Sequence, residues 1–243
     1  MTPATETSPS PLAGKIQVLA FDVFGTVVDW HGSVSRAVDN LELGVRGDKF
    51  ALAWRAGYAP AMRRVASGEL GWTRIDDLHR VILDDILEQF GARRLSEDQK
   101  IQLNRVWHRL QPWPDSVEGL TRLKAGFTLC TLSNGNIGLL ANMAKNAGLP
   151  WDCILSAETF RKYKPDPDTY RGVARIFDVP PARVMMVAAH QDDLESAREC
   201  GLRTAYIERP FEFGKSRPKE VSPGAGNDLH ARTILDLADQ LGC

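Results

Sequence analysis

Reactive side chains stand in four groups along the 243-residue chain. The groups hold a carboxylate, a hydroxyl beside an amide, an amine, and an imidazole followed by acids: Asp22; Ser133 and Asn134; Lys164; and His190 with Asp192 and Asp193. Carboxylates, amines and imidazoles can attack a substrate or move a proton, so they are the usual parts of a catalytic site. An active site is therefore expected if the fold brings the groups together.

Each group follows a stretch with the pattern of a buried strand. Residues 16–21 are mostly apolar and run directly into Asp22, and further strands are expected at 127–132, 153–156, 184–189 and 203–207. Helical patterns fall between them, which predicts an α/β fold with a Rossmann-like parallel sheet. Ligands of such sheets gather beyond the carboxyl ends of the strands, where all four groups would lie.

The loop after Asp22 has features suited to holding an anion. Gly25 lets the loop turn tightly, so that the backbone N–H groups of Val23 and Phe24 can face the site. The Thr26 hydroxyl can hydrogen-bond Asp22 and fix its orientation. The simpler alternative is an aspartate that caps a helix with a threonine beside it.

The other groups also have simpler explanations when taken singly. Ser133 and Asn134 are favoured helix-capping residues, Lys164 could be a surface lysine, and a lone histidine is usually structural. Their succession at four strand ends favours a functional site over four unrelated features.

Between the first strand and the rest of the sheet, the apolar spacing is helical from residue 32 to about 113. We therefore expect a flexible tail at 1–14, a core formed by 15–30 and 114–243, and an all-helical cap at 31–113 inserted after the first strand. The active site would lie between core and cap, since clefts between domains favour ligands.

The composition excludes several classes of function. The chain has 43% hydrophobic residues, 25% charged residues and a formal net charge of −1. Its charge therefore gives no reason to expect binding to nucleic acid or to an anionic membrane surface. Its four cysteines are widely spaced, which indicates neither disulfides nor a zinc site. No signal peptide or apolar span is present, so a cytoplasmic protein with a small-molecule substrate is expected, and an apolar cap face is compatible with a homodimer.

From about Lys15 to its end, the chain resembles the haloacid dehalogenase superfamily and, within it, the 2-haloacid dehalogenases. The resemblance is carried by residues 21–26 (FDVFGT), 132–135 (LSNG) and 164–166 (KPD), by Asp193, and by Trp54-Arg55 and residues 112–115 (PWPD). It implies hydrolytic dehalogenation of short 2-haloalkanoic acids, mostly of S configuration, to 2-hydroxy acids.

The resemblance also implies a role for each matching residue. The Asp22 carboxylate would displace the halide from C2 and form an ester, which water then hydrolyses at the carboxyl carbon. Lys164 would keep Asp22 ionised, Asp193 would orient Lys164 or the water, and Tyr170 would support Lys164. Arg55 and Asn134 would receive the halide, while Ser133 and the amides of Val23 and Phe24 would hold the substrate carboxylate.

Phe24 separates dehalogenation from the phosphatase chemistry of the same superfamily. Phosphatases of this type carry a second aspartate at that position to protonate the leaving alcohol, whereas a halide leaves without a proton. Asp192 and Asp193 could supply an acid for Mg²⁺, but a haloacid offers no phosphate to neutralise, so we expect no metal and no other cofactor.

The chain departs from the commoner dehalogenase pattern after the fourth strand. Ala188 and His190 replace a serine and an asparagine, and Asp192 replaces an aromatic residue, which puts the usual placement of the hydrolytic water in doubt. His190 is the candidate base in their place. A Mg²⁺-dependent phosphatase or phosphonatase, and a binding module that keeps only the fold, remain the alternatives.

Overall fold

A computed structural model describes residues 10–92, 95–222 and 224–243. The expected tail at 1–14 therefore lies mainly outside the described residues. Of its described part, the Ser10 N–H donates to the Gln240 carbonyl (2.7 Å), and Leu12 and Ala13 pack against the hydrophobic core.

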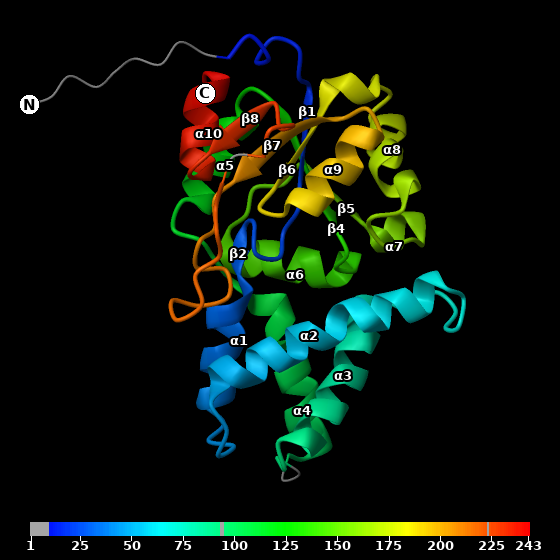
Figure 1. Cartoon of the computed structure of the whole chain (residues 1–243), viewed down its shortest axis with the longest axis vertical. Helices are drawn as coiled ribbons and strands as arrows, with labels where there is room; N and C mark the ends of the chain where they lie inside the picture. Colours follow the sequence, from blue (N-terminus) through cyan, green and yellow to red (C-terminus); the bar gives the residue numbers. More distant parts are fainter. Residues whose placement is uncertain (1–9, 93–94, 223) are drawn as a thin grey trace, which may run out of the picture.

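One six-stranded sheet forms the centre of the molecule (Figure 1). Its order is β5-β4-β1-β6-β7-β8, and every neighbouring pair is parallel. The first strand lies inside the sheet, so the residues that follow it reach the middle of the carboxyl edge. The strands are β1 (Val18–Phe21), β4 (Thr128–Ser133), β5 (Cys153–Ser156), β6 (Val184–Ala188), β7 (Arg203–Ile207) and β8 (Leu229–Ala231).

The residues of β1 alternate between two apolar layers, as the period of a strand requires. Leu19 and Phe21 face the layer that contains α5 (Ser116–Lys124), α6 (Ile137–Ala147) and α10 (Ile234–Leu241), whereas Val18 and Ala20 face α8 (Pro167–Ile176) and α9 (Gln191–Glu199). Figure 1 shows α8 and α9 on the side of the sheet opposite α5 and α10. Both faces of the sheet are thus covered, which explains the continuous apolar run of residues 18–21.

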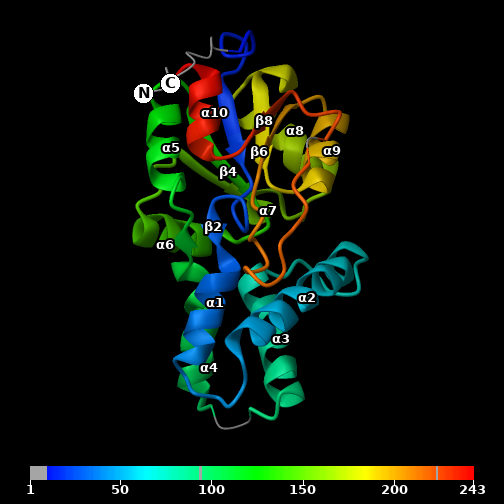
Figure 2. The ribbon, with the colours of Figure 1, turned by 60° about the vertical axis from the view of Figure 1, so that its left-hand side comes forward.

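The helical cap lies beyond the carboxyl edge of this sheet (Figures 1 and 2). The chain enters and leaves it side by side, through an antiparallel pair formed by β2 (Val28–Asp29) and β3 (Gln111–Pro112). Asp29 begins the first cap helix by accepting the Gly32 N–H, and Ser96 begins the fourth with a capping box. The cap elements are α1 (Trp30–Asp39), α2 (Gly47–Ala66), α3 (Ile75–Gln89), α4 (Glu97–Asn104) and a 3₁₀ helix, η1 (Arg105–Arg109).

The expected α/β core with a helical cap after the first strand is confirmed. Three expected strands differ in their bounds: 16–21 begins at residue 18, 127–132 begins at 128 and ends at 133, and 184–189 ends at 188. The sequence did not reveal β8 or the short β2–β3 pair, and α7 (Ala157–Phe160) was likewise unexpected. These elements are two to four residues long, too short for a periodic pattern.

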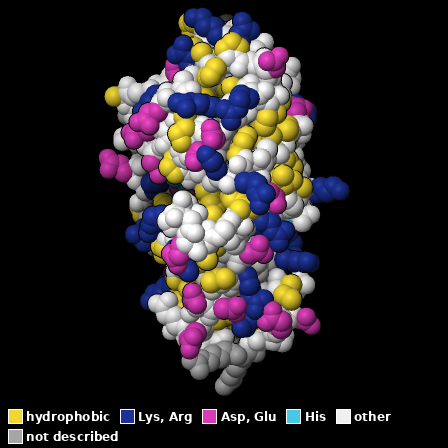
Figure 3. All heavy atoms as spheres, turned by 90° about the vertical axis from the view of Figure 1, so that its right-hand side faces the viewer, with side chains coloured by type: hydrophobic (Ala, Val, Ile, Leu, Met, Phe, Trp, Pro, Cys, Tyr) yellow, Lys and Arg dark blue, Asp and Glu magenta, His cyan; other side chains and the backbone are white. Residues whose placement is uncertain are grey.

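No helix among the described residues is long and apolar enough to cross a membrane. All four cysteines have free thiols. On the face shown in Figure 3, acidic and basic side chains are interspersed rather than gathered by sign, in agreement with the net charge of −1.

Candidate active site

The Asp22 carboxylate lies at the centre of the candidate site, directly after β1. Its Oδ1 accepts from Lys164 Nζ at 3.1 Å, while its Oδ2 accepts from Thr26 Oγ1 at 2.7 Å and lies 3.2 Å from His190 Nδ1. Burial by itself would raise the pKa of this carboxyl, but the ammonium, the imidazole and the hydroxyl outweigh burial and hold the pKa well below its usual range. Asp22 is therefore ionised although only 7% of it is exposed.

The loop after Asp22 is shaped by a close approach of another acid. Gly25 has φ +86°, and a Cβ atom there would lie 2.4 Å from Glu212 Oε1. Glycine is thus required by both conformation and space. Thr26 ties the loop to the end of β6, because its Oγ1 accepts the Ala189 N–H at 2.9 Å.

Lys164 bridges two carboxylates inside the site. Its Nζ lies 3.1 Å from Asp22 Oδ1 and 2.5 Å from Asp193 Oδ2, with 8% of its side chain exposed. Burial by itself would lower the pKa of Lys164, but Asp193 and Asp22 raise it above its ordinary value. The Tyr170 hydroxyl donates to Asp193 Oδ1 at 2.6 Å, so Tyr170 reaches Lys164 through this acid.

His190 connects Asp22 to a second buried carboxylate. His190 Nε2 lies 2.8 Å from Glu212 Oε1, on the opposite side of the ring from Asp22. Burial by itself would lower the pKa of His190, but Glu212 and Asp22 raise it to about 10. Burial would raise the pKa of Glu212, but His190 and Lys219 lower it to about 2. The imidazole is therefore protonated at neutral pH in the free enzyme.

Glu212 and Lys219 are the two residues of this group that sequence reasoning missed. Glu212 is fully buried, and it accepts from Trp30 Nε1 at 3.3 Å and from Lys219 Nζ at 2.8 Å. Both lie in the long connection between β7 and β8, after the last expected strand. The available signal was an acid between two aromatic residues, Phe211 and Phe213.

A cavity of about 620 Å³ opens between the core and α2, and we call it the cap-side cavity. From the cap, Arg55 and Tyr58 line it, and the Arg55 guanidinium lies 4.2 Å from the centroid of the Tyr58 ring. Arg55 Nε is buried without a hydrogen-bond partner among the described residues. From the core, the cavity is lined by Asp22, Phe24, Asn134, Tyr163, Lys164, Pro165, Asp166, Tyr170, His190, Asp192, Asp193 and Ser196.

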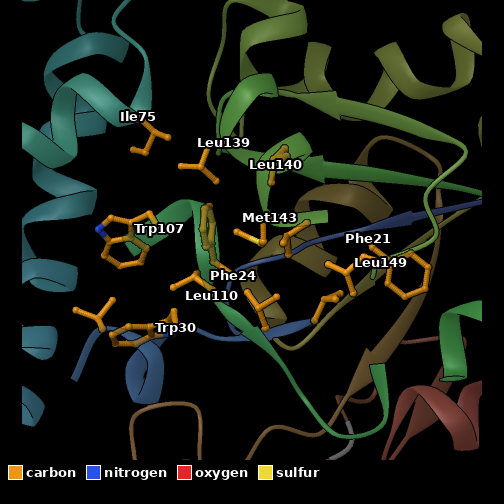
Figure 4. Packing of buried hydrophobic residues seen from close by; sticks show 14 of the residues in the cluster. Phe21, Phe24, Trp30, Ile75, Trp107, Leu110, Leu139, Leu140, Met143 and Leu149 are labelled. Carbon is orange, nitrogen blue, oxygen red and sulfur yellow. The ribbon is translucent and has the colours of Figure 1, made fainter. Parts of the chain in front are cut away.

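Phe24 places an apolar ring in the wall of this cavity, two residues after Asp22. Only 5% of Phe24 is exposed, and its ring meets Trp107 edge-on, with 5.9 Å between the ring centroids. Figure 4 shows Phe24 within the apolar cluster between the cap and the core. The Phe24 side chain has no acidic hydrogen, so it cannot donate a proton to a leaving group.

Three sequence-predicted residues lie behind the cavity wall rather than on it. Thr26 contacts Asp22 from within the core, Val23 is buried, and Ser133 is fully buried with its Oγ accepting the Gly135 N–H at 3.2 Å. Asn134 does line the cavity, and its Oδ1 accepts the Lys164 N–H at 2.8 Å. Ser133 thus orders the loop before α6, and Asn134 positions the backbone of Lys164.

The residues present do not fit the Mg²⁺ of the superfamily's phosphatases. The oxygens of Asp22 and Asp193 that would meet a cation are already bound by Lys164, and His190 adds a second positive charge. The described residues contain no group of three or more histidines, cysteines or acids with the geometry of a metal site.

A family model described as haloacid dehalogenase-like hydrolase matches residues 16–201. The chain belongs to this family. The matched segment contains Asp22, Lys164, His190 and Asp193 but ends before Glu212 and Lys219.

Individual relatives have haloacid dehalogenase names. The chain is 32% identical over 218 residues to (S)-2-haloacid dehalogenase 1 of Pseudomonas sp. (strain CBS-3), covering 85% of this chain and 88% of that protein. The solved structure of the defluorinating L-2-haloacid dehalogenase Rha0230 is 42% identical, with a TM-score of 0.91 and coverage of 97% and 99%. L-2-haloacid dehalogenase from Xanthobacter autotrophicus with chloropropionic acid covalently bound is 26% identical, with a TM-score of 0.79 and coverage of 92% and 97%.

Proposed function

We propose that this chain hydrolyses short 2-haloalkanoic acids to 2-hydroxy acids through an ester on Asp22. The observation that carries the proposal is a buried, ionised carboxylate that faces a cavity whose adjacent wall is Phe24 instead of an acid. A halide leaves as a stable anion, so dehalogenation needs the carboxylate nucleophile but no acid beside it. Cleavage of a phosphate ester needs an acid to protonate the leaving alcohol, and Phe24 cannot serve as one. The relative with covalently bound chloropropionic acid supports the covalent route.

In the first step, an Asp22 oxygen attacks C2 from the side opposite the halogen, so that the C–O bond forms as the C–halogen bond breaks. Oδ1 is the better nucleophile of the two oxygens, because it has one hydrogen-bond partner and Oδ2 has two. The halide leaves toward Arg55 and Asn134, and the amides of Val23 and Phe24 hold the substrate carboxylate. Attack from behind inverts C2.

In the second step, water attacks the carboxyl carbon of the Asp22 ester, with His190 as the base. Ester formation removes the negative charge on Asp22, which is one of the two charges that raise the pKa of His190. The imidazole can then lose its proton and accept one from water, while Glu212 holds its ring in place. The solvent oxygen enters Asp22, and the product hydroxyl keeps the former carboxylate oxygen.

A test of the function compares halide and phosphate release by the wild type, Asp22→Asn and the control Asp98→Asn. Chloroacetate, fluoroacetate, S-2-chloropropionate and a phosphomonoester are the substrates. We expect halide release by the wild type, a loss on the order of 10⁵-fold in Asp22→Asn, and little change in Asp98→Asn, because Asp98 is an exposed acid of α4 that does not line the cavity. Phosphate release with intact carbon–halogen bonds would favour the Mg²⁺-dependent alternative, and release of neither ion would favour a binding module.

Several finer predictions belong to the same proposal. They are a core of residues 15–30 and 114–243 with a cap at 31–113, a cytoplasmic location and a homodimer. Size-exclusion chromatography with light scattering would measure the oligomeric state.

A further inference from the structure

His190 and Asp192 line two cavities. One is the cap-side cavity, and the other, of about 300 Å³, is bordered by the connection between β7 and β8; we call it the rear cavity. The exposed residues Glu220 and Ser222 lie at the rim of the rear cavity, so it reaches the surface. Its lining is formed by Ala189, His190, Gln191, Asp192, Tyr206, Phe213, Lys219, Glu220 and Ser222.

A series of polar contacts connects His190 to the rear cavity. His190 Nε2 lies 2.8 Å from Glu212 Oε1, and Glu212 Oε2 accepts from Lys219 Nζ at 2.8 Å. Lys219 lines the rear cavity, and its Nζ also donates to the Ala189 carbonyl at 2.5 Å. A proton that leaves His190 Nε2 therefore meets a carboxylate whose cationic partner borders the rear cavity.

Ester hydrolysis requires both a water molecule and a route for a proton. While the ester is present, the substrate lies between Asp22 and the cap, beside the rings of Phe24 and Tyr58, and so displaces water from that side of Asp22. His190 contacts Asp22 Oδ2 at 3.2 Å and also lines the rear cavity. Water that arrives from the rear cavity would meet the base before it meets the ester.

We propose that the rear cavity admits the hydrolytic water to His190 and carries away the proton that the reaction releases. The proposal rests on the function proposed above. It assigns substrate and halide to the cap-side cavity, and the hydrolytic water and the released proton to the rear cavity. Lys219, Asp192 and Glu220 are the charged groups that line the rear cavity beside His190, and Glu212 lies between His190 and Lys219.

The proton balance identifies when the rear route is used. After Asp22 is alkylated and the halide leaves, the protonated His190 gives one proton to solvent. The neutral imidazole takes a proton from water as the new oxygen binds the carboxyl carbon, and it returns that proton to the departing 2-hydroxy acid oxygen. The regenerated Asp22 carboxyl then protonates His190 again, so each turnover releases one proton and one halide.

The test narrows the rear cavity by a bulky side chain at its rim. The variants are Ser222→Trp and Glu220→Trp, and the matched control is Ser216→Trp, an exposed serine of the same loop that does not line the cavity. Single-turnover experiments with S-2-chloropropionate measure halide release for the first step and 2-hydroxy acid formation for the second. We expect halide release within about twofold of the wild type, ester hydrolysis slower by about tenfold in either rim variant, and an unchanged control.

Ester accumulation, measured by mass spectrometry of the quenched protein, supports the proposal when it occurs in a rim variant and not in Ser216→Trp. Unchanged ester hydrolysis in both rim variants overturns it, and so does equal slowing of both steps, which indicates a general structural effect. The two proposals fail in different ways. Absence of halide release by the wild type would overturn the proposed function, whereas normal halide release with normal ester hydrolysis in every variant would overturn only the role of the rear cavity.

Discussion

At the scale of single residues, the site holds a chain of alternating charges. Asp193, Lys164, Asp22, His190, Glu212 and Lys219 are connected by contacts of 2.5–3.2 Å. Each buried charge has a partner of opposite sign, which offsets the cost of burial. Alkylation of Asp22 removes one charge from the middle of this chain, and the largest effect is expected at its neighbour His190.

Replacement of His190 by asparagine should stop the reaction after its first step. The shorter amide side chain would be close to Asp22 but could not accept a proton, so we expect one equivalent of halide, ester accumulation and a fall in kcat of roughly 10²- to 10⁴-fold. Mass spectrometry of the intact protein measures the ester. His230→Asn is the matched control, because His230 is also paired with a glutamate, Glu208, at 2.6 Å but lies outside the site. Undiminished turnover in His190→Asn would contradict the assigned role.

A comparison of the wild type with His190→Asn across pH tests the charge of His190 in the folded enzyme. The pKa of about 10 is raised from 6.5, so the stabilisation by the protonated imidazole is complete below pH 6.5 and is lost as the pH rises through about 10. The difference in Tm between the wild type and His190→Asn should therefore be largest near neutral and mildly acidic pH and decrease toward pH 10. Differential scanning calorimetry across this range measures it, and a difference that grows with pH would have the wrong sign.

At the scale of elements, the carboxyl edge of the sheet and one long connection supply the site. The pattern of strand and helix predicted five of the six strands of the sheet, because each is a mostly apolar run of four or more residues. It therefore predicted that Asp22, Asn134, Lys164 and His190 would meet. Glu212 could not be predicted in the same way, because it lies in an irregular segment after β7 whose path depends on contacts with Trp30 and Gly25.

Glu212→Gln should show how much this connection contributes. The amide cannot balance the charges of His190 and Lys219, so we expect a loss of about 3 kcal/mol in the free energy of unfolding, together with slower ester hydrolysis. Urea unfolding gives the first quantity. Glu208→Gln is the control: Glu208 also pairs with a histidine but is partly exposed, so its loss should be below about 1 kcal/mol. Equal losses in the two variants would contradict a special role for Glu212.

At the scale of the whole molecule, polar contacts join the cap and the core, and one of them involves Tyr163, which lines the cap-side cavity. The Tyr163 hydroxyl of the core donates to the Thr73 carbonyl of the cap at 2.7 Å. Asn136, the residue before α6, donates from Nδ2 to Asp76 of α3 at 3.0 Å. The sequence predicted the cap but not these contacts, because each depends on the angle at which the two parts meet.

Tyr163→Phe removes one of these contacts without removing the ring that packs on Trp72, with 5.0 Å between the centroids. A hydrogen bond of this kind is worth about 1 kcal/mol, so a less firmly held cap should raise KM for S-2-chloropropionate by about fivefold. The reacting groups around Asp22 are untouched, so kcat should change by less than about twofold. Thr121→Val is the control, since it removes a hydroxyl bond of the same 2.7 Å length within α5, far from the cap. A fall in kcat with unchanged KM would mean that Tyr163 acts on the reacting groups instead of on the closure of the cap.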